Sequence, residues 1–367
     1  MLVLSLALAS AAIGCGETAG AGGGAPTGPS PAVLDSALQE GVRASGAPGA
    51  TAAVVVDGQL LWSGATGRAR LGRGGAMRTG SLFPIASTTK TVTATMVMAL
   101  AEDGALDLDR PIAPELPWVA GARRITPRQL LSHSSGLSDY FADGAIFRIA
   151  ARHPYHRWTR REVLAHAHGL RFRPGSRHSY SNSGYVALGG MVEATSGERV
   201  DDFFQERIAE PLGLEGSTFR YGAAPQRLFA HPLRPAGGGR LHDRFGRRAR
   251  VPTDYWGETW TDGGLATTSA GLAQIGNGVY AGDLLTPASV AQMLPEKPGG
   301  WGLGTFDKRA LGRRWIGHDG SYGGYQTENW TDRAAGVTVV VATNGAGMGV
   351  LSPRIWRAVA AAVEAGS

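Results

Sequence analysis

The sequence predicts an α+β fold: one antiparallel β-sheet flanked by N- and C-terminal helices, with an all-helical subdomain inserted into it. β-Rich runs lie near both ends of the chain, at 49–67 and 313–344. Helical patterns dominate the stretch between them, and two more, 31–45 and 352–365, lie outside them. Strands so distant in sequence can share one sheet when the intervening segment folds as an insertion.

The composition is that of a globular protein with a large core. The chain has 367 residues, of which 43% are hydrophobic and 18% charged, which suffices for one large domain or two closely joined subdomains. The net charge is +6, but the arginines are scattered and do not alternate with stacking aromatic residues as in nucleic-acid modules. We therefore expect no nucleic-acid partner.

The N-terminal segment has the pattern of an export signal. Residues 1–14 are apolar and end in small residues before Cys15, the single cysteine. The run is shorter than the ~20 residues that cross a membrane and is typical of a signal peptide. Ala-Ile-Gly-Cys resembles a bacterial lipobox, although Ala12 stands where leucine is usual. We expect a signal peptide over 1–15, lipidation of Cys15 and a place in the cell envelope at the membrane, with a periplasmic or secreted protein as the alternative.

A flexible linker and one folded domain are expected after Cys15. Residues 16–31 are almost entirely Gly, Ala, Pro, Ser and Thr, which cannot bury a face and behave as a tether. The domain then spans 32–367. We expect its α/β part at about 32–95 and 260–367, and its helical part at about 96–259.

Local patterns predict the elements of the domain in order. Apolar residues recur at helical spacing over 31–45. Asp57-Gly58 joins two β-rich runs and predicts a hairpin. An apolar helix is expected from 87 to 102, before Gly104. Further helices are expected at 126–132, 158–168, 182–196, 200–209 and 352–365, and further strands at 313–320, 324–332 and 336–344.

The stretch PIASTTK, residues 84–90, carries the first candidate for chemistry. A serine hydroxyl is a poor nucleophile unless a base or a cation activates it. If Ser87 opens the helix, Lys90 lies one turn later on the same face. The chain has three lysines among its 36 lysine and arginine residues, and an ammonium, unlike a guanidinium, can lose its proton when desolvated. The alternative is a helix-capping serine with a surface lysine.

Two later segments carry polar groups suited to the same chemistry. Tyr180 and Asn182 lie in PGSRHSYSNSGY, where a tyrosine near a cation could have a lowered pKa and take up a proton. His318 ends a predicted strand and precedes Gly320 and Ser321. A glycine there allows close approach of a substrate to the strand, and the Ser321 amide could face an oxyanion together with that of Ser87. Each segment alone could equally be an ordinary turn or strand end.

Together the motifs resemble the serine β-lactamase and DD-peptidase superfamily. Ser-x-x-Lys, Tyr-x-Asn and His-x-Gly occur in its order, and LLSHSSGL (130–137) and GGLATTSAGLAQIG (263–276) are also similar to it. The similarity is greatest to the group of class C β-lactamases, DD-carboxypeptidases, D-aminopeptidases and esterases, and covers about 32–345. It implies the β-lactamase/transpeptidase-like fold.

The resemblance also implies residue roles. Ser87 would be acylated, Lys90 would tune it and relay protons, and Tyr180 would be the base in acylation and the acid for the leaving group. Asn182 would position Lys90 and the substrate carbonyl, and His318 would replace the usual third-motif lysine. The Ser87 and Ser321 amides, beside Gly320, would bind the oxyanion. No metal or other cofactor is expected. The expected partner is a small-molecule or peptide substrate. The protein is expected to be a monomer.

Asp319 departs from the pattern, because threonine usually stands there and helps to hold a substrate carboxylate. An ionised Asp319 facing the cleft would repel a carboxylate and suit an amine or a neutral ester, whereas an Asp319 pointing away would have no such effect. We therefore expect an exported serine hydrolase of amides or esters. The alternatives are a D-alanyl-D-alanine carboxypeptidase, a class C-type β-lactamase, and a penicillin-binding-like sensor or binding lipoprotein without turnover.

Overall fold

The computed structural model describes most of the folded chain. Described residues span 28–366, except 74, 154–155, 223, 247–257 and 283. The predicted signal peptide, Cys15 and most of the predicted linker lie outside the described residues. Among the described residues, the helices are all too short or too polar to cross a membrane.

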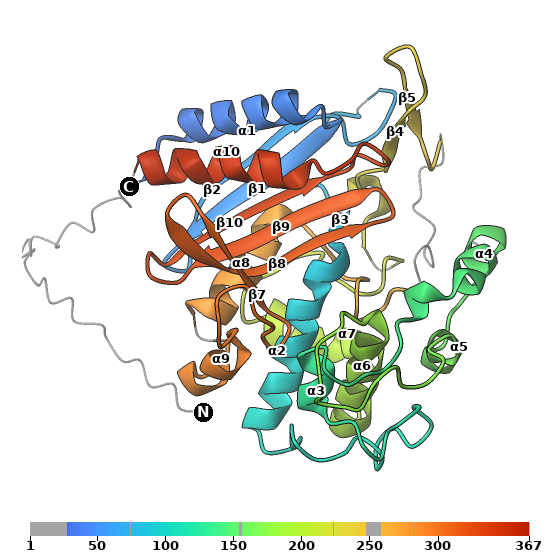
Figure 1. Ribbon diagram of the computed structural model, residues 1–367. Coiled ribbons are helices and arrows are strands. Elements are labelled where there is room, and N and C mark those ends of the chain that lie inside the picture. The colour runs from blue at the N-terminus through green and yellow to red at the C-terminus, as the bar shows by residue number, and fades with distance from the viewer. Residues whose placement is uncertain are drawn as a thin grey trace, which may run out of the picture.

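A six-stranded antiparallel sheet forms the centre of the molecule (Figure 1). Its strand order, β2-β1-β10-β9-β8-β7, places the first strand of the chain beside the last one. Seven residue pairs join β1 to β10, from Ala50↔Thr343 to Val56↔Val337. The predicted union of distant segments in one sheet is confirmed. The strands are β1 (Gly49–Val56), β2 (Gln59–Gly67), β7 (Phe306–Ala310), β8 (Arg313–Tyr322), β9 (Tyr325–Asp332) and β10 (Val337–Thr343).

The terminal helices α1 (Pro31–Ser45) and α10 (Ser352–Ala365) cover one face of this sheet (Figure 1). Leu34 and Leu38 of α1 are fully buried in a cluster with side chains of α10 and the sheet, and each such burial stabilises the fold by roughly 1.5–3 kcal/mol. Gly41 permits the close crossing of the helices, since a Cβ there would lie 3.0 Å from the Ile355 backbone. The predicted flanking helices are confirmed.

The opposite face of the sheet packs on α8 (Ser269–Tyr280), α2 (Thr89–Glu102) and the inserted segment (Figure 1). Val55 and Val340 of the sheet belong to the same buried cluster as Val92 of α2 and Tyr185 of the insertion. The sheet and the inserted part therefore share one continuous core.

The inserted part is largely helical but contains short strands, which corrects the expectation of an all-helical subdomain. β4 and β5 form a small hairpin inside the stretch predicted as helical. Its elements are α3 (Pro127–Leu131), α4 (Gly144–Arg152), α5 (Arg160–Ala165), α6 (Asn182–Ser196), α7 (Val200–Phe204) with a π-helical turn (Gln205–Ala209), 3-10 turns η2 (Tyr140–Ala142) and η4 (Gln226–Leu228), β4 (Leu233–Pro235) and β5 (Leu241–Asp243). The remaining elements are β3 (Phe83–Pro84), the 3-10 turn η1 (Ala86–Thr88), β6 (Ala266–Thr267) and α9 (Pro287–Met293).

Candidate active site

Ser87 lies in a 3-10 turn, η1 (Ala86–Thr88), between β3 and α2. The preceding Ala86 has φ of +51°, a left-handed conformation that is uncommon for a residue with a Cβ and is found where the surroundings enforce it. Two hydrogen bonds with Leu265 hold the residues on either side of this turn. The Leu265 carbonyl accepts the Ile85 N–H at 2.9 Å, and its own N–H donates to Thr89 Oγ1 at 3.2 Å. The half-buried Ser87 side chain is thus held at the start of a helix.

Lys90 is fully buried one turn after Ser87 and points its ammonium at three acceptors. Nζ donates to Ser87 Oγ at 3.3 Å, to Asn182 Oδ1 at 2.7 Å and to the Asp262 carbonyl at 2.5 Å. Burial lowers the pKa of Lys90 to about 8, although the negative charge of Asp262 opposes the decrease. A lysine with this pKa can hold or release a proton near neutral pH, which a surface lysine cannot do.

Asn182 is held in one orientation by Asp139. Asn182 begins α6, and its Nδ2 donates to both carboxylate oxygens of Asp139, at 3.0 and 3.3 Å. Because an ionised carboxylate only accepts hydrogen bonds, this contact turns Oδ1 of Asn182 toward Lys90. Sequence motifs did not single out Asp139, which lies just after the LLSHSSGL stretch.

Asp262 is a second acidic residue beside Lys90 that the motifs missed, and it is buried. Its Oδ2 accepts the Tyr140 hydroxyl at 3.0 Å, and burial raises its pKa to about 7. Its Oδ1 is buried without a hydrogen-bond partner among the described residues. The carbonyl of the same residue is the shortest contact of Lys90, so one residue supplies both a backbone acceptor and a nearby charge.

Tyr180 is half-buried beside Ser87, with its phenol oxygen enclosed, but its environment differs from the one expected. Burial raises the pKa of its phenol, the negative charges of Asp262, Asp319 and Asp139 raise it further, and the Ser87 hydroxyl only partly opposes the increase. The Lys90 ammonium lies 5.0 Å from the ring centroid. The expectation of a lowered tyrosine pKa is therefore wrong, because desolvation is the largest effect on the phenol. The phenol oxygen is without a hydrogen-bond partner among the described residues.

His133 fixes the backbone on both sides of Tyr180. Its carbonyl accepts the Ser179 N–H at 2.8 Å, and its Nδ1 accepts the Ser181 N–H at 3.1 Å. His133 has a positive φ of +57° and is 2% exposed. Burial holds its pKa well below the usual range, so the ring is neutral. The residue stands in LLSHSSGL, but the motif alone gave no sign of this role.

His318 reaches the site from β8. Its ring centroid lies 6.3 Å from that of Tyr180, and burial lowers its pKa to about 4. Nδ1 lies 2.5 Å from the Asp319 carbonyl, which can only accept, so Nδ1 carries the hydrogen and Nε2 carries a lone pair. Nε2 is buried without a partner among the described residues. The imidazole therefore offers an acceptor, not a cation.

Gly320 allows β8 to lie directly against the Ser87 turn. A Cβ there would lie 2.4 Å from the Ile85 carbonyl oxygen.

The ladder of β8 with β7 stops at Gly317, and Tyr322 and Tyr325 close the two-residue turn to β9. In such a hairpin the closing pair is hydrogen bonded and the next pair is not. The amide of Ser321, the next residue inward, therefore points to the free edge of β8.

Asp319, like Ser321, is a predicted site residue with an exposed side chain. It alternates along β8 with His318 and Gly320 and pairs across the ladder with Glu328. Its side chain is 65% exposed, with Oδ1 4.0 Å from Nδ1 of His318. Asp319 lies at the rim of the site, where its negative charge raises the pKa of Lys90 and of Tyr180 without direct contact. The structure thus brings together Ser87, Lys90, Tyr180, Asn182 and His318, with the Gly320–Ser321 backbone alongside.

Within the described part of the chain, groups of three His, Cys, Asp or Glu side chains placed to share a metal ion do not occur.

The chain matches the family model described as Beta-lactamase over residues 34–364. It is 31% identical to penicillin-binding protein 4 of Amycolatopsis lactamdurans, over 81% of each chain. It is 27% identical to a D-aminopeptidase of Cereibacter sphaeroides over 85% of this chain, but it spans only 59% of that relative's length. It is 28% identical to esterase EstB of Burkholderia gladioli, over 87% of this chain and 92% of the relative.

Solved structures agree with this assignment. A D-stereospecific amidohydrolase from Streptomyces sp. has a TM-score of 0.74 and 28% identity, covering 92% of this chain and all of that one. The predicted fold and family are confirmed: the chain belongs to the beta-lactamase family and is a serine hydrolase of that family.

Proposed function

We propose that the protein hydrolyses amides or esters through an acyl-enzyme on Ser87. The observation that carries the proposal is the position of Lys90. A buried amine lies 3.3 Å from the Ser87 hydroxyl and has a pKa lowered to about 8. In its neutral form Lys90 accepts the Ser87 proton while Oγ attacks the substrate carbonyl carbon. The Ser87 and Ser321 amides donate to the oxyanion that forms.

Tyr180 is proposed as the acid for the leaving group. Its raised pKa keeps the phenol protonated in the free enzyme, so Lys90 rather than Tyr180 starts as the base. When the tetrahedral intermediate collapses, Tyr180 gives its proton to the leaving nitrogen or oxygen and recovers one from Lys90. A water molecule then attacks the acyl carbon and passes a proton along the same route, which releases the acid and restores Ser87.

The preferred substrates are proposed to carry an amine or no charge near the scissile bond. His318 presents a neutral acceptor at Nε2 where a lysine would present a cation. Asp139, Asp262 and Asp319 lie around Lys90, and each adds negative charge there in its ionised form. This field favours a substrate N–H or ammonium and disfavours a carboxylate. D-Aminopeptidase and D-stereospecific amidohydrolase relatives support amino-acid amides as the substrate class, and the EstB relative supports simple esters.

A substrate series with one acyl core tests this proposal. D-Alanine p-nitroanilide, its N-acetyl form and its N-succinyl form carry an ammonium, no charge and a carboxylate. We expect kcat/KM to fall in that order. A preference for the succinyl form would contradict the electrostatic argument, and no turnover of these compounds, p-nitrophenyl acetate or nitrocefin would contradict the hydrolase.

A second candidate is a penicillin-binding protein whose acyl-enzyme is long-lived, which the Amycolatopsis relative supports. It predicts a stable mass adduct with a β-lactam in place of steady turnover. A D-alanyl-D-alanine carboxypeptidase and a class C-type β-lactamase would instead turn over a D-Ala-D-Ala peptide and nitrocefin, respectively.

We further propose, on the sequence pattern around Cys15, that the protein is exported and lipid-anchored. That it is a monomer is a separate proposal. Incorporation of labelled palmitate into the wild type but not into Cys15→Ser tests the anchor. Sedimentation of the protein without its first 27 residues tests the monomer. The Pyrococcus abyssi structural relative, at 25% identity, is described as octameric.

A further inference from the structure

Trp301 and Phe306 add an aromatic wall to the end of the candidate active site where His318 lies. The ring centroid of Phe306 lies 4.9 Å from that of His318 and 5.3 Å from that of Trp301. The Trp301 ring in turn lies 5.4 Å from the ring of His133, which stacks on Tyr180. Trp301 and Phe306 are both half-buried, so part of each residue remains accessible beside the buried site residues.

Backbone hydrogen bonds fix the segment that carries the aromatic wall. Leu303 N–H donates to the Met293 carbonyl at 3.0 Å. Gly304 N–H donates to the Leu131 carbonyl at 3.2 Å, and the Gly304 carbonyl accepts the Thr91 hydroxyl of α2 at 2.9 Å. The wall is therefore formed before any ligand binds, which lowers the entropic cost of binding.

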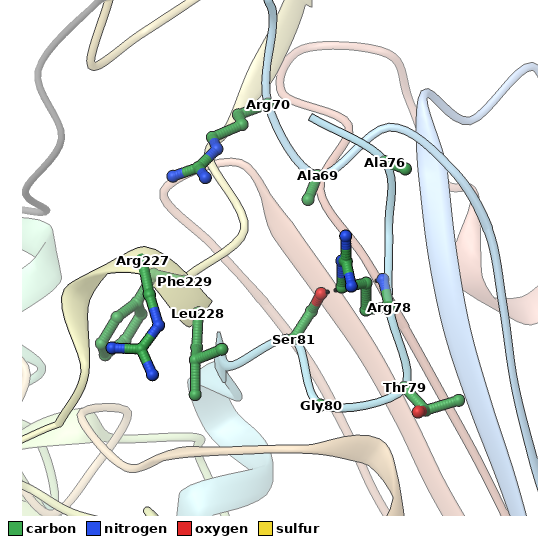
Figure 2. A pocket seen from close by; sticks show the side chains of 10 residues that line it. All are labelled: Ala69, Arg70, Ala76, Arg78, Thr79, Gly80, Ser81, Arg227, Leu228 and Phe229. Carbon is green, nitrogen blue, oxygen red and sulfur yellow. Dashed lines mark hydrogen bonds between the residues drawn. The ribbon is translucent and has the colours of Figure 1, made fainter. Parts of the chain in front are cut away.

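The hollow in Figure 2 does not gather its groups in this way. It has a volume of about 740 Å³ and lies by the turn before β3. Its arginines Arg70, Arg78 and Arg227 point away from one another (Figure 2), so they do not meet on one ligand. The rings of the aromatic wall, in contrast, lie 4.9–5.4 Å from one another and from the two site histidines.

The position of Tyr180 places the aromatic wall at the leaving-group end of the site. In the proposed reaction the substrate carbonyl oxygen meets the Ser321 amide at the free edge of β8. Because an extended strand advances about 3.3 Å per residue, His318 lies roughly 10 Å before that amide along the strand, and Tyr322 lies just after it. The ring of Tyr180, the proposed proton donor to the leaving group, lies 6.3 Å from that of His318. The leaving group therefore extends toward His318 and the acyl part toward Tyr322.

We propose that the aromatic wall binds an uncharged aromatic leaving group, the aryl or benzyl part of an amide or ester. This inference rests on the proposed function, since it names the part of the substrate that leaves Ser87. A ligand ring beside Trp301 and Phe306 can take the offset or edge-to-face geometry that aromatic pairs prefer. Nε2 of His318, buried without a partner among the described residues, can accept the N–H of a leaving amide.

Two amides of D-alanine test the aromatic wall, because their leaving amines have nearly equal basicity. The N-benzyl amide carries a ring and the N-(2-methoxyethyl) amide does not. The values of kcat/KM are compared for the wild type, Trp301→Leu, Trp301→Phe and Trp118→Leu. Trp118 supplies the matched control, since it is a half-buried tryptophan whose ring contacts Arg161.

The ratio of the two kcat/KM values is the informative quantity. We expect the wild type, Trp301→Phe and Trp118→Leu to favour the benzyl amide by about fivefold to tenfold, and Trp301→Leu by under about twofold. A merely structural role of Trp301, such as support of His133, would lower both values together and leave the ratio unchanged. An unchanged ratio in Trp301→Leu would therefore overturn the proposal.

A binding measurement separates the aromatic wall from catalysis. N-Benzylacetamide is titrated into Ser87→Ala alone and into Ser87→Ala combined with Trp301→Leu or Trp118→Leu, and bound ligand is followed by NMR. We expect saturable binding that Trp301→Leu weakens by about fivefold and Trp118→Leu by under about twofold. If the wild type turns over neither amide, the proposed function fails and this binding decides on the wall. Absence of saturable binding, or equal weakening by both substitutions, would then overturn it.

Discussion

The imidazole ring of His133 lies almost parallel to the phenol ring of Tyr180, with 4.4 Å between the ring centroids and 24° between the planes. The same histidine receives backbone hydrogen bonds from Ser179 and Ser181. Tyr180 is thus fixed by a ring on its face and by bonds at both neighbouring residues. We interpret His133 as a positioning residue for the proposed proton donor.

His133→Asn tests this relationship, because asparagine tolerates a positive φ and offers a short acceptor but has no ring. We expect kcat to fall by about tenfold, because a displaced catalytic group loses orientation, while KM changes by less than about twofold. His178→Asn is the control, since His178 is exposed and its ring stacks on Trp301 rather than on Tyr180. Wild-type kcat in His133→Asn would refute the positioning role.

The pH profile should report the amine of Lys90. If neutral Lys90 is the base, kcat/KM rises with pH through the lowered pKa of about 8. Ionised Asp262 raises the pKa of Lys90, so Asp262→Asn lowers that pKa and moves the rising limb to lower pH. The amide still accepts the Tyr140 hydroxyl. A limb that stays in place or moves to higher pH in this variant would show that Lys90 is not the group that titrates.

Asp139→Asn should impair turnover through Asn182. A second amide at 139 no longer forces Nδ2 of Asn182 toward it, so Lys90 loses a reliable acceptor at 2.7 Å. We expect kcat to fall by about tenfold or more. Asp143→Asn removes a comparable carboxylate that caps α4 outside the site and should leave kcat within about twofold. Equal effects of the two substitutions on kcat would mean that Asp139 acts only on stability.

Asp319→Thr should shift selectivity toward substrates with a free carboxylate. The substitution removes a negative charge 4.0 Å from the His318 ring and restores the hydroxyl usual in the family. The pair to compare is a D-Ala-D-Ala peptide and its C-terminal amide. We expect the ratio of their kcat/KM values to rise in favour of the free acid by about fivefold to tenfold, the size of one screened charge interaction. An unchanged ratio would show that Asp319 does not act on substrate choice.

Much of the fold could be predicted because local and long-range patterns agree. The 31–45 and 182–196 helices have the predicted bounds, since each ends at a glycine, Gly46 and Gly197, with positive φ. The Asp57-Gly58 turn lies where the hairpin was expected. Short strands such as β7 and β4 were missed, because pairing with distant partners rather than their own composition defines them.

The candidate site was predictable only to the extent that its residues fall in motifs. Ser87, Lys90, Tyr180, Asn182 and His318 could be named from spacing, and the structure brings them together. Asp139 and Asp262 could not, because burial and position beside Lys90 are properties of the folded chain. The direction of the Tyr180 pKa shift was predicted wrongly for the same reason. The motifs suggested that Lys90 lies near Tyr180, but the sequence does not show that folding removes water from the phenol.

The acyl-enzyme on Ser87 is the central claim, and mass spectrometry of the quenched reaction tests it most directly. The wild type, Ser87→Ala and Ser321→Ala are mixed with p-nitrophenyl acetate, stopped with acid, and mapped by peptide mass. Ser321→Ala is the matched control, because it keeps the backbone amide of the free β8 edge. The account predicts one acetyl group on the peptide that contains Ser87 in the wild type and in Ser321→Ala, and none in Ser87→Ala. Turnover by Ser87→Ala at the wild-type rate, or acetylation at another serine, would contradict it.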